Sequence, residues 1–305
     1  MSGNPNETVP RTATGTGTGT ATAVAADAGH RHASREPLPG EREGAYDGLR
    51  TLTYGSGPTV LWLHGYTMDA TLWRPLWRLL PGLRHVGVDL PGHGGSEALR
   101  PGLSLPELAA RVRGLAREQE ARRWVGLSFG STVALEMALA YPDEVDRLVV
   151  GAPTPAGGPP DPAARKRYIE MLMLRRMRGA EAAELLADLW MAAPPDIFRG
   201  TEAHPLLRAE LRSVVARHSW AELDNGAMAG LSSHVHSGED LARITARTFA
   251  LTGSADMPAF HANAALLSRV VPHCRAHVVP GAGHLPFLEQ PWAVAPLLLD
   301  HLLAC

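Results

Sequence analysis

Short runs of apolar residues recur along this chain, and they constrain its fold more than any other feature. Each run is closed by glycine, proline, serine or histidine, which is typical of strands buried on both faces. Longer stretches with helical spacing of apolar residues lie between them. This alternation predicts an α/β fold, a mostly parallel open sheet with helices on both faces. The expected strands are 59–63, 86–90, 124–127, 148–150, 248–251 and 276–279, and the expected helices are 105–120, 129–140, 262–271 and 292–303.

Two segments fall outside this alternation. Residues 1–40 contain almost no large apolar side chains and are rich in Thr, Gly and Ala, so we expect a disordered tail. Residues 154–244 contain no clear strand, and their helix-like stretches predict a helical insertion over the sheet. The α/β core is then 41–153 and 245–305. Helix-like stretches of the insertion are 162–178, 180–192 and 205–217, and a hairpin is expected over 44–54 around Asp47-Gly48.

Charge and cysteine content narrow the classes of partner and compartment. The net charge of −2 argues against nucleic-acid binding through bulk charge. No run of 18 or more apolar residues is present, so we expect no membrane-spanning helix and no membrane partner. The two cysteines, Cys274 and Cys305, cannot form a disulfide framework and lack metal-ligand spacing, which favours a cytoplasmic location.

The pattern G-x-S-x-G occurs at 126–130, between a predicted strand and a predicted helix. A serine on such a sharp turn is held in a strained backbone and exposes its hydroxyl at the edge of the sheet. We therefore predict that Ser128 is a nucleophile. The alternative is a helix-capping serine, since serine commonly caps helices.

A serine nucleophile needs a base, and the base needs an orienting carboxylate. His284 lies in a glycine-rich loop after the last predicted strand, and Asp256 follows the strand before it. Both positions are carboxyl ends of strands, where ligands bind in open α/β sheets. The chain order Ser, Asp, His supports this triad. Glu222 and Asp224 in the insertion are weaker candidates for the acid.

The tetrahedral intermediate of acyl transfer needs two hydrogen-bond donors for its oxyanion. The Phe129 N–H opens the predicted helix and supplies one donor. The Tyr66 N–H, in the loop after the strand 59–63, supplies the other. His64 in the same loop is a candidate second base, but we favour a role in holding the loop.

Five segments together resemble the α/β-hydrolase superfamily over residues 42–304. They are His64-Gly65-Tyr66, the run 89–96 (Asp-Leu-Pro-Gly-His-Gly-Gly-Ser), the G-x-S-x-G at 126–130, Gly253-x-x-Asp256, and Gly283-His284 followed by 286–291 (Pro-Phe-Leu-Glu-Gln-Pro). The resemblance implies that residues 154–244 are the lid that covers the site. It points to the esterase, enol-lactonase and carbon–carbon hydrolase branches. The run 129–132 is similar to prolyl aminopeptidases.

Two residues depart from particular branches of that superfamily. The nucleophile is Ser128 rather than Asp, which disfavours dehalogenase and epoxide-hydrolase chemistry, and Ser131 replaces a third small glycine of many esterases. We expect hydrolysis of a carboxylic ester, lactone or thioester of a small, largely apolar acyl substrate, without a cofactor or metal. Met171, Leu174 and Trp190 of the lid are candidate substrate contacts, although we expect most apolar side chains of the lid to pack against the core instead.

Three other functions remain open at this point. A prolyl-type aminopeptidase would need lid carboxylates to bind an amine. An acyltransferase or cyclase, or a receptor with an inert triad, would use the same scaffold. The oligomeric state is not predicted.

Overall fold

The computed structural model describes residues 36–158 and 162–304, and the predicted tail lies almost wholly outside these ranges. At the end of that predicted tail, Leu38 is buried in the core. No helix in the described ranges is long and apolar enough to cross a membrane.

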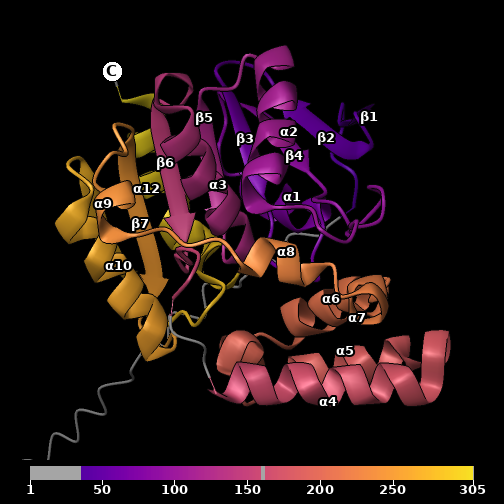
Figure 1. Ribbon diagram of the computed structural model, residues 1–305. Helices are drawn as coiled ribbons and strands as arrows, with labels where there is room; N and C mark the ends of the chain where they lie inside the picture. Colours follow the sequence, from indigo (N-terminus) through magenta and orange to yellow (C-terminus); the bar gives the residue numbers. More distant parts are fainter. Residues whose placement is uncertain (1–35, 159–161, 305) are drawn as a thin grey trace, which may run out of the picture. The chain divides into compact units, whose positions relative to one another are not determined.

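An eight-stranded sheet in the order β1-β2-β4-β3-β5-β6-β7-β8 forms the centre of the fold. Pairing is antiparallel for β1–β2 and β2–β4 and parallel for every later pair. Figure 1 shows helices packed on both faces of this sheet, so the predicted α/β class is confirmed. The strands are β1 (Arg42–Tyr46), β2 (Leu49–Gly55), β3 (Thr59–Leu63), β4 (Arg84–Val88), β5 (Arg123–Leu127), β6 (Arg147–Gly151), β7 (Arg247–Gly253) and β8 (Cys274–Val279).

The hairpin that opens the sheet forms where the Asp-Gly pair predicts it. Both Asp47 (φ 44°) and Gly48 (φ 74°) have positive φ angles, as a tight hairpin turn requires. The strand expected at 86–90 is observed two residues earlier, at Arg84–Val88. Asp89 directly follows this strand, and its side chain accepts hydrogen bonds from Ala70 N–H, at the start of the 3₁₀ turn Ala70–Trp73, and from Gly95 N–H.

The core helices follow the strands closely. The helix α3 begins and ends at the residues expected, and α10 begins earlier than expected because Pro258 occupies its first turn, where proline is tolerated. These helices are α1 (Arg74–Trp77), α2 (Leu105–Glu118), α3 (Phe129–Ala140), α10 (Pro258–Val270), α11 (Pro286–Glu289) and α12 (Pro291–Leu303), with 3₁₀ turns η1 (Ala70–Trp73) and η2 (Pro142–Glu144).

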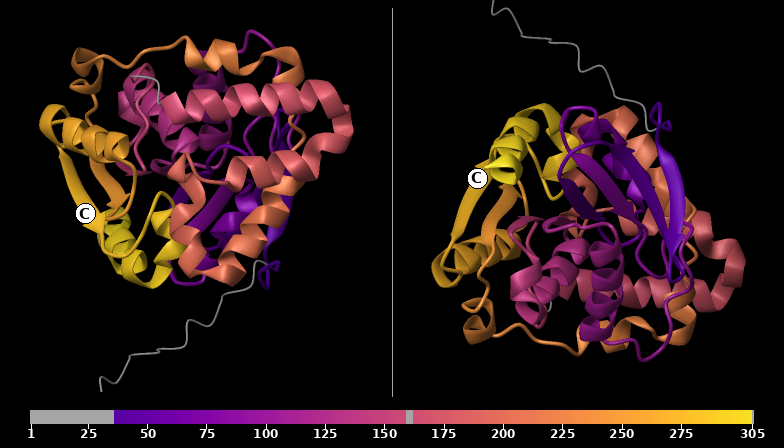
Figure 2. Two further views of the ribbon diagram at one scale, coloured as in Figure 1. Left: turned by 90° about the horizontal axis from the view of Figure 1, so that it is seen from below. Right: turned by 90° about the horizontal axis from the view of Figure 1, so that it is seen from above.

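The segment between β6 and β7 is helical, as the sequence predicts, and lies toward the carboxyl ends of the strands. In Figure 1 the arrowheads of β6 and β7 point toward it, and Figure 2 (left) shows its long α4 helix in front of the sheet. The spacing of apolar residues does not predict the short helices of this segment, because packing rather than helix propensity stabilises them. The segment contains α4 (Pro162–Arg178), η3 (Gly179–Ala182), α5 (Ala183–Met191), η4 (Asp196–Ala203), α6 (Pro205–Ala216), α7 (Ala221–Asn225), α8 (Met228–Ser232) and α9 (Gly238–Leu241).

Buried apolar side chains form two clusters, one on each face of the sheet. Successive residues of β3 alternate between them, since Trp62 belongs to one cluster and Leu61 to the other. The cluster with Trp62 also takes in the lid side chains Met171, Trp190 and Trp220. The lid is therefore packed into the same apolar core as one face of the sheet.

Close approach of α3 to β3 depends on glycine at position 130. A Cβ atom on Gly130 would lie 2.2 Å from the carbonyl oxygen of Leu63, and one on Gly126 would lie 2.5 Å from the carbonyl oxygen of Gly130. Backbone atoms cannot move aside as a flexible side chain can. The two glycines of G-x-S-x-G thus set how tightly the helix meets the sheet.

We predict that Gly130→Ala destabilises the fold, because α3 must shift away from Leu63 to admit a methyl group. Overpacking of this kind costs about 1–3 kcal/mol, measurable as a lower Tm in thermal unfolding. Gly238→Ala is the matched control, since a Cβ there meets no atom within 4 Å. Equal Tm values for the two variants would contradict the prediction.

Candidate active site

Ser128 lies at the turn between β5 and α3, in a backbone conformation that serine rarely adopts. Its φ is 51° and its ψ is −115°, and a non-glycine residue in such a region is strained. The side chain makes no capping hydrogen bond to the helix. This geometry does not fit the alternative of a capping serine, and it leaves the hydroxyl available to other partners.

The structure brings the three predicted triad side chains together. His284 Nε2 lies 3.1 Å from Ser128 Oγ, and His284 Nδ1 lies 3.0 Å from Asp256 Oδ1. Because an ionised carboxylate only accepts, Nδ1 carries the proton and Nε2 is free to accept one from the serine. Asp256 Oδ1 also accepts from Met257 N–H at 2.8 Å. His284 is buried, and the ring of Phe260 packs edge-on against it.

The loop that carries His284 is held by a buried carboxylate to which the sequence analysis assigned no role. Glu289 accepts hydrogen bonds from Gly283 N–H (2.6 Å) and Leu285 N–H (3.0 Å), the two residues that flank His284. Burial raises the pKa of Glu289 above its ordinary value, although the two N–H groups act in the opposite direction. The signal in the sequence was an acidic residue directly after the apolar run 286–288.

Two backbone N–H groups beside Ser128 have no acceptor within the described residues. They belong to Tyr66 and Phe129, the predicted oxyanion donors. Phe129 opens α3, where the helix dipole favours negative charge. The loop before Tyr66 lies against the nucleophile, since a Cβ on Gly65 would be 3.7 Å from Ser128 Cβ. Free donors at this point are suited to receive an oxyanion.

Both ring nitrogens of His64 form hydrogen bonds with backbone groups. Its Nδ1 lies 2.8 Å from Gly65 O, and its Nε2 accepts from Leu90 N–H at 3.0 Å. Burial lowers the pKa of His64, so the ring is neutral. These bonds fit the role of holding the loop and leave no nitrogen free to act as a second base.

The three lid residues predicted as substrate contacts lie in the apolar packing between lid and sheet. Met171 is fully buried and Leu174 is half-buried against the same cluster. Trp190 is buried, and its Nε1–H donates to Thr67 Oγ1 at 2.9 Å. Their contact with substrate stays a prediction.

Glu222 and Asp224, the weaker candidates for the triad acid, bind other partners. Glu222 accepts from the Tyr66 hydroxyl at 2.5 Å and lies 2.9 Å from His218 Nε2. Asp224 pairs with Arg175 at 2.7 Å on the lid surface. Neither forms a hydrogen bond with His284.

One cluster in the described residues has the composition of a metal site. Glu136 on α3 lies 3.0 Å from His234 Nε2 and 2.9 Å from His236 Nε2, where the lid returns to the core. However, His236 Nδ1 accepts from Ala156 N–H at 3.1 Å. The ring proton of the neutral histidine is therefore on Nε2, which has no lone pair for a metal. The cluster instead ties the two ends of the lid to α3.

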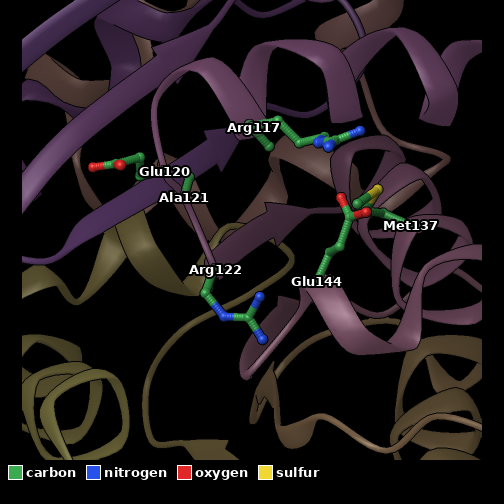
Figure 3. Close-up of a pocket in the computed structure, with 7 residues that line it drawn as sticks. Arg117, Glu120, Ala121, Arg122, Met137 and Glu144 are labelled. Carbon is green, nitrogen blue, oxygen red and sulfur yellow. The ribbon is translucent and has the colours of Figure 1, made fainter.

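One surface pocket lies at the amino ends of the strands, far from the triad. Figure 3 shows Arg117, Arg122, Met137 and Glu144 around it, near the point where β5 begins. Because Ser128 follows the last residue of β5, this pocket and the triad lie at opposite ends of one strand. The pocket therefore plays no part in the chemistry described here.

We predict that Glu289→Gln lowers kcat, because an amide has one acceptor oxygen where the loop uses two. The N–H left without a partner costs about 1–3 kcal/mol, and the loop then holds His284 less firmly. Steady-state kinetics with an ester checks this, with the exposed Glu239→Gln as control. An unchanged kcat would show that the loop does not need Glu289.

We also predict that zinc does not stabilise the protein at Glu136, His234 and His236. Binding would break the bond between Ala156 N–H and His236. Thermal unfolding with and without added zinc measures this. A saturable rise in Tm that disappears in His234→Ala would show that the tautomer assignment is wrong.

Comparison with known proteins points to one family. The family model described as "Alpha/beta hydrolase family" matches residues 60–296. Similar curated proteins include the pimeloyl-[acyl-carrier protein] methyl ester esterases of Yersinia enterocolitica and Xanthomonas campestris pv. campestris. The first is 30% identical over 244 residues, covering 78% of this chain and 90% of the relative. The second is 30% identical over 253 residues, covering 80% and 94%.

Solved structures share the fold at lower sequence identity. The enol-lactonase from Burkholderia xenovorans LB400 superposes with a TM-score of 0.69 at 19% identity, covering 86% of this chain and all of that chain (100%). The carboxylesterase CesB from Bacillus subtilis gives 0.68 at 23% identity, covering 86% and 90%. The resemblance predicted from the sequence is thereby confirmed, and this chain belongs to the alpha/beta hydrolase family.

Proposed function

We propose that this protein is a carboxylic ester hydrolase that acts through an acyl-enzyme on Ser128. The observation that carries the proposal is the hydrogen-bonded series Ser128–His284–Asp256, at 3.1 Å and 3.0 Å. Ester hydrolysis also fits the relatives, which are named as esterases.

The geometry supports the following sequence of steps. Ser128 Oγ attacks the ester carbonyl while His284 Nε2 takes its proton, and Asp256 stabilises the resulting imidazolium. The N–H groups of Tyr66 and Phe129 hold the oxyanion of the tetrahedral intermediate. His284 then gives its proton to the departing alkoxide, which leaves an acyl group on Ser128. Water, deprotonated by His284, attacks this acyl group and releases the acid and the free serine.

The substrate we propose is a small ester with an apolar acyl chain. The relatives' names describe methyl esters of an acyl group, so acyl methyl esters are the first compounds to test. The apolar lid side chains Met171, Leu174 and Trp190 are proposed to contact the acyl chain. Lactones and thioesters remain within the proposal because they pass through the same acyl-enzyme.

Other activities have less support. An aminopeptidase would need a lid carboxylate to bind the substrate's amine, and Glu222 Oε1 is already shared by Tyr66 and His218. An acyltransferase or cyclase would use the same triad, but the relatives' names do not favour it.

We further propose that the enzyme works in the cytoplasm on a small acyl substrate and does not bind nucleic acid.

We predict that Ser128→Ala abolishes ester hydrolysis and covalent labelling by a fluorophosphonate. Loss of a triad nucleophile costs up to about 10⁶-fold in kcat in a well-studied serine hydrolase. A panel of methyl esters with increasing acyl length measures turnover, and intact mass spectrometry measures labelling. Ser232→Ala, at an exposed serine of α8, is the control and should still be labelled. Parental turnover by Ser128→Ala would contradict the proposal.

A further inference from the structure

Three residues of the loop after β3 each form a polar contact with the lid. The Tyr66 hydroxyl donates to Glu222 at 2.5 Å. The next residue, Thr67, accepts from Trp190 Nε1–H at 2.9 Å. Asp69 lies 3.4 Å from Arg217. This loop carries the Tyr66 N–H, so the loop of one proposed oxyanion donor is held from the lid by α5, by α7 and by Arg217, which follows α6.

The loop has a conformation that its own sequence does not favour. Thr67 has a φ of 64°, which is a strained outlier for a β-branched residue. Thr67 Oγ1 donates to Tyr66 O at 2.6 Å and accepts from Trp190. A strained backbone persists only where neighbouring contacts hold it. Here one of those contacts comes from the lid.

Glu222 is a buried carboxylate that two neighbouring donors stabilise. It is 2% exposed, and an unpaired carboxylate at such a site costs several kcal/mol. Burial acts to raise its pKa, but the hydrogen bond and charge of His218, together with the Tyr66 hydroxyl, hold the pKa below its ordinary value. One oxygen of an ionised Glu222 therefore accepts from two protein donors, and the bond from Tyr66 is charge-assisted.

We propose that Glu222 is a positioning residue for the oxyanion hole, and that it acts through the hydroxyl of Tyr66. Its carboxylate fixes the Tyr66 side chain and thereby the backbone of residues 65–67. The Tyr66 N–H is then aimed at the carbonyl oxygen bound at Ser128. Trp190 supports the same loop one residue further on. This inference rests on the proposed function, since it needs Ser128 to be the nucleophile.

The test compares Tyr66→Phe and Glu222→Gln with the parent enzyme and with Asn225→Ala. Tyr66→Phe keeps the backbone N–H and removes only the hydroxyl. Asn225 is the matched control, because it lies on the same helix as Glu222 and donates to Leu99 O at 3.3 Å, away from the loop. Fluorophosphonate titration of Ser128 counts folded active sites, so kcat is expressed per functional enzyme. The inhibition constant of a trifluoromethyl ketone, which forms a tetrahedral adduct, reports on the oxyanion hole.

Losing an oxyanion donor outright costs about 10²–10³ in rate, so we expect a misdirected donor to lower kcat by about tenfold. KM should stay within about threefold, because uniform binding is not affected. The trifluoromethyl ketone should bind about tenfold more weakly to both variants, and the double variant should be no worse than either single one. Asn225→Ala should match the parent in each measurement.

Two results would overturn the inference. Parental kcat per titrated site in both variants would show that Glu222 has only a structural role, whatever the change in Tm. A lower kcat with unchanged affinity for the trifluoromethyl ketone would show that the effect does not pass through the oxyanion hole. Failure of the proposed function is a different result, in which the parent enzyme neither hydrolyses esters nor labels at Ser128.

Discussion

The close contact between α3 and the strands beside it is the constraint on which the site depends. Because position 130 has no side chain, α3 approaches the carbonyl oxygen of Leu63 directly. Ser128 must then turn through a strained conformation between β5 and α3. That turn places its hydroxyl at the carboxyl ends of the strands and directs the first N–H of the helix to the same point. The loops after β3, β7 and β8 supply the remaining groups at this edge.

The lid contacts the loops on both sides of this site. On the side of the oxyanion donors, Glu222 and Trp190 bind the loop after β3. On the side of the base, the backbone of Gly200 in η4 packs against Gly283 and Glu289, where an added Cβ would lie 2.1 Å from the carboxylate of Glu289. The lid therefore packs against both loops on which the proposed site depends.

The sequence predicted the sheet, its long helices and the residues that the structure brings to its edge, because these depend on local patterns. Apolar runs and the turn residues that close them indicate the strands directly, and α3 begins at the expected Phe129. What escaped prediction depends on contacts between distant segments. The pairing of Tyr66 with Glu222 joins residues 156 positions apart, and Glu289 acts by accepting two N–H groups of a loop folded around it. The short helices α7 to α9 likewise exist through packing.

The two ends of the lid meet. The N–H of His236 donates to Ala156 O at 2.9 Å, and the N–H of Ala156 donates back to the His236 ring. A segment that leaves and re-enters a fold at one point can be lengthened, shortened or exchanged without moving the strands that carry it. The length of the lid is therefore less constrained by the sheet than its inner surface is, because that surface supplies the acceptor of the Tyr66 hydroxyl.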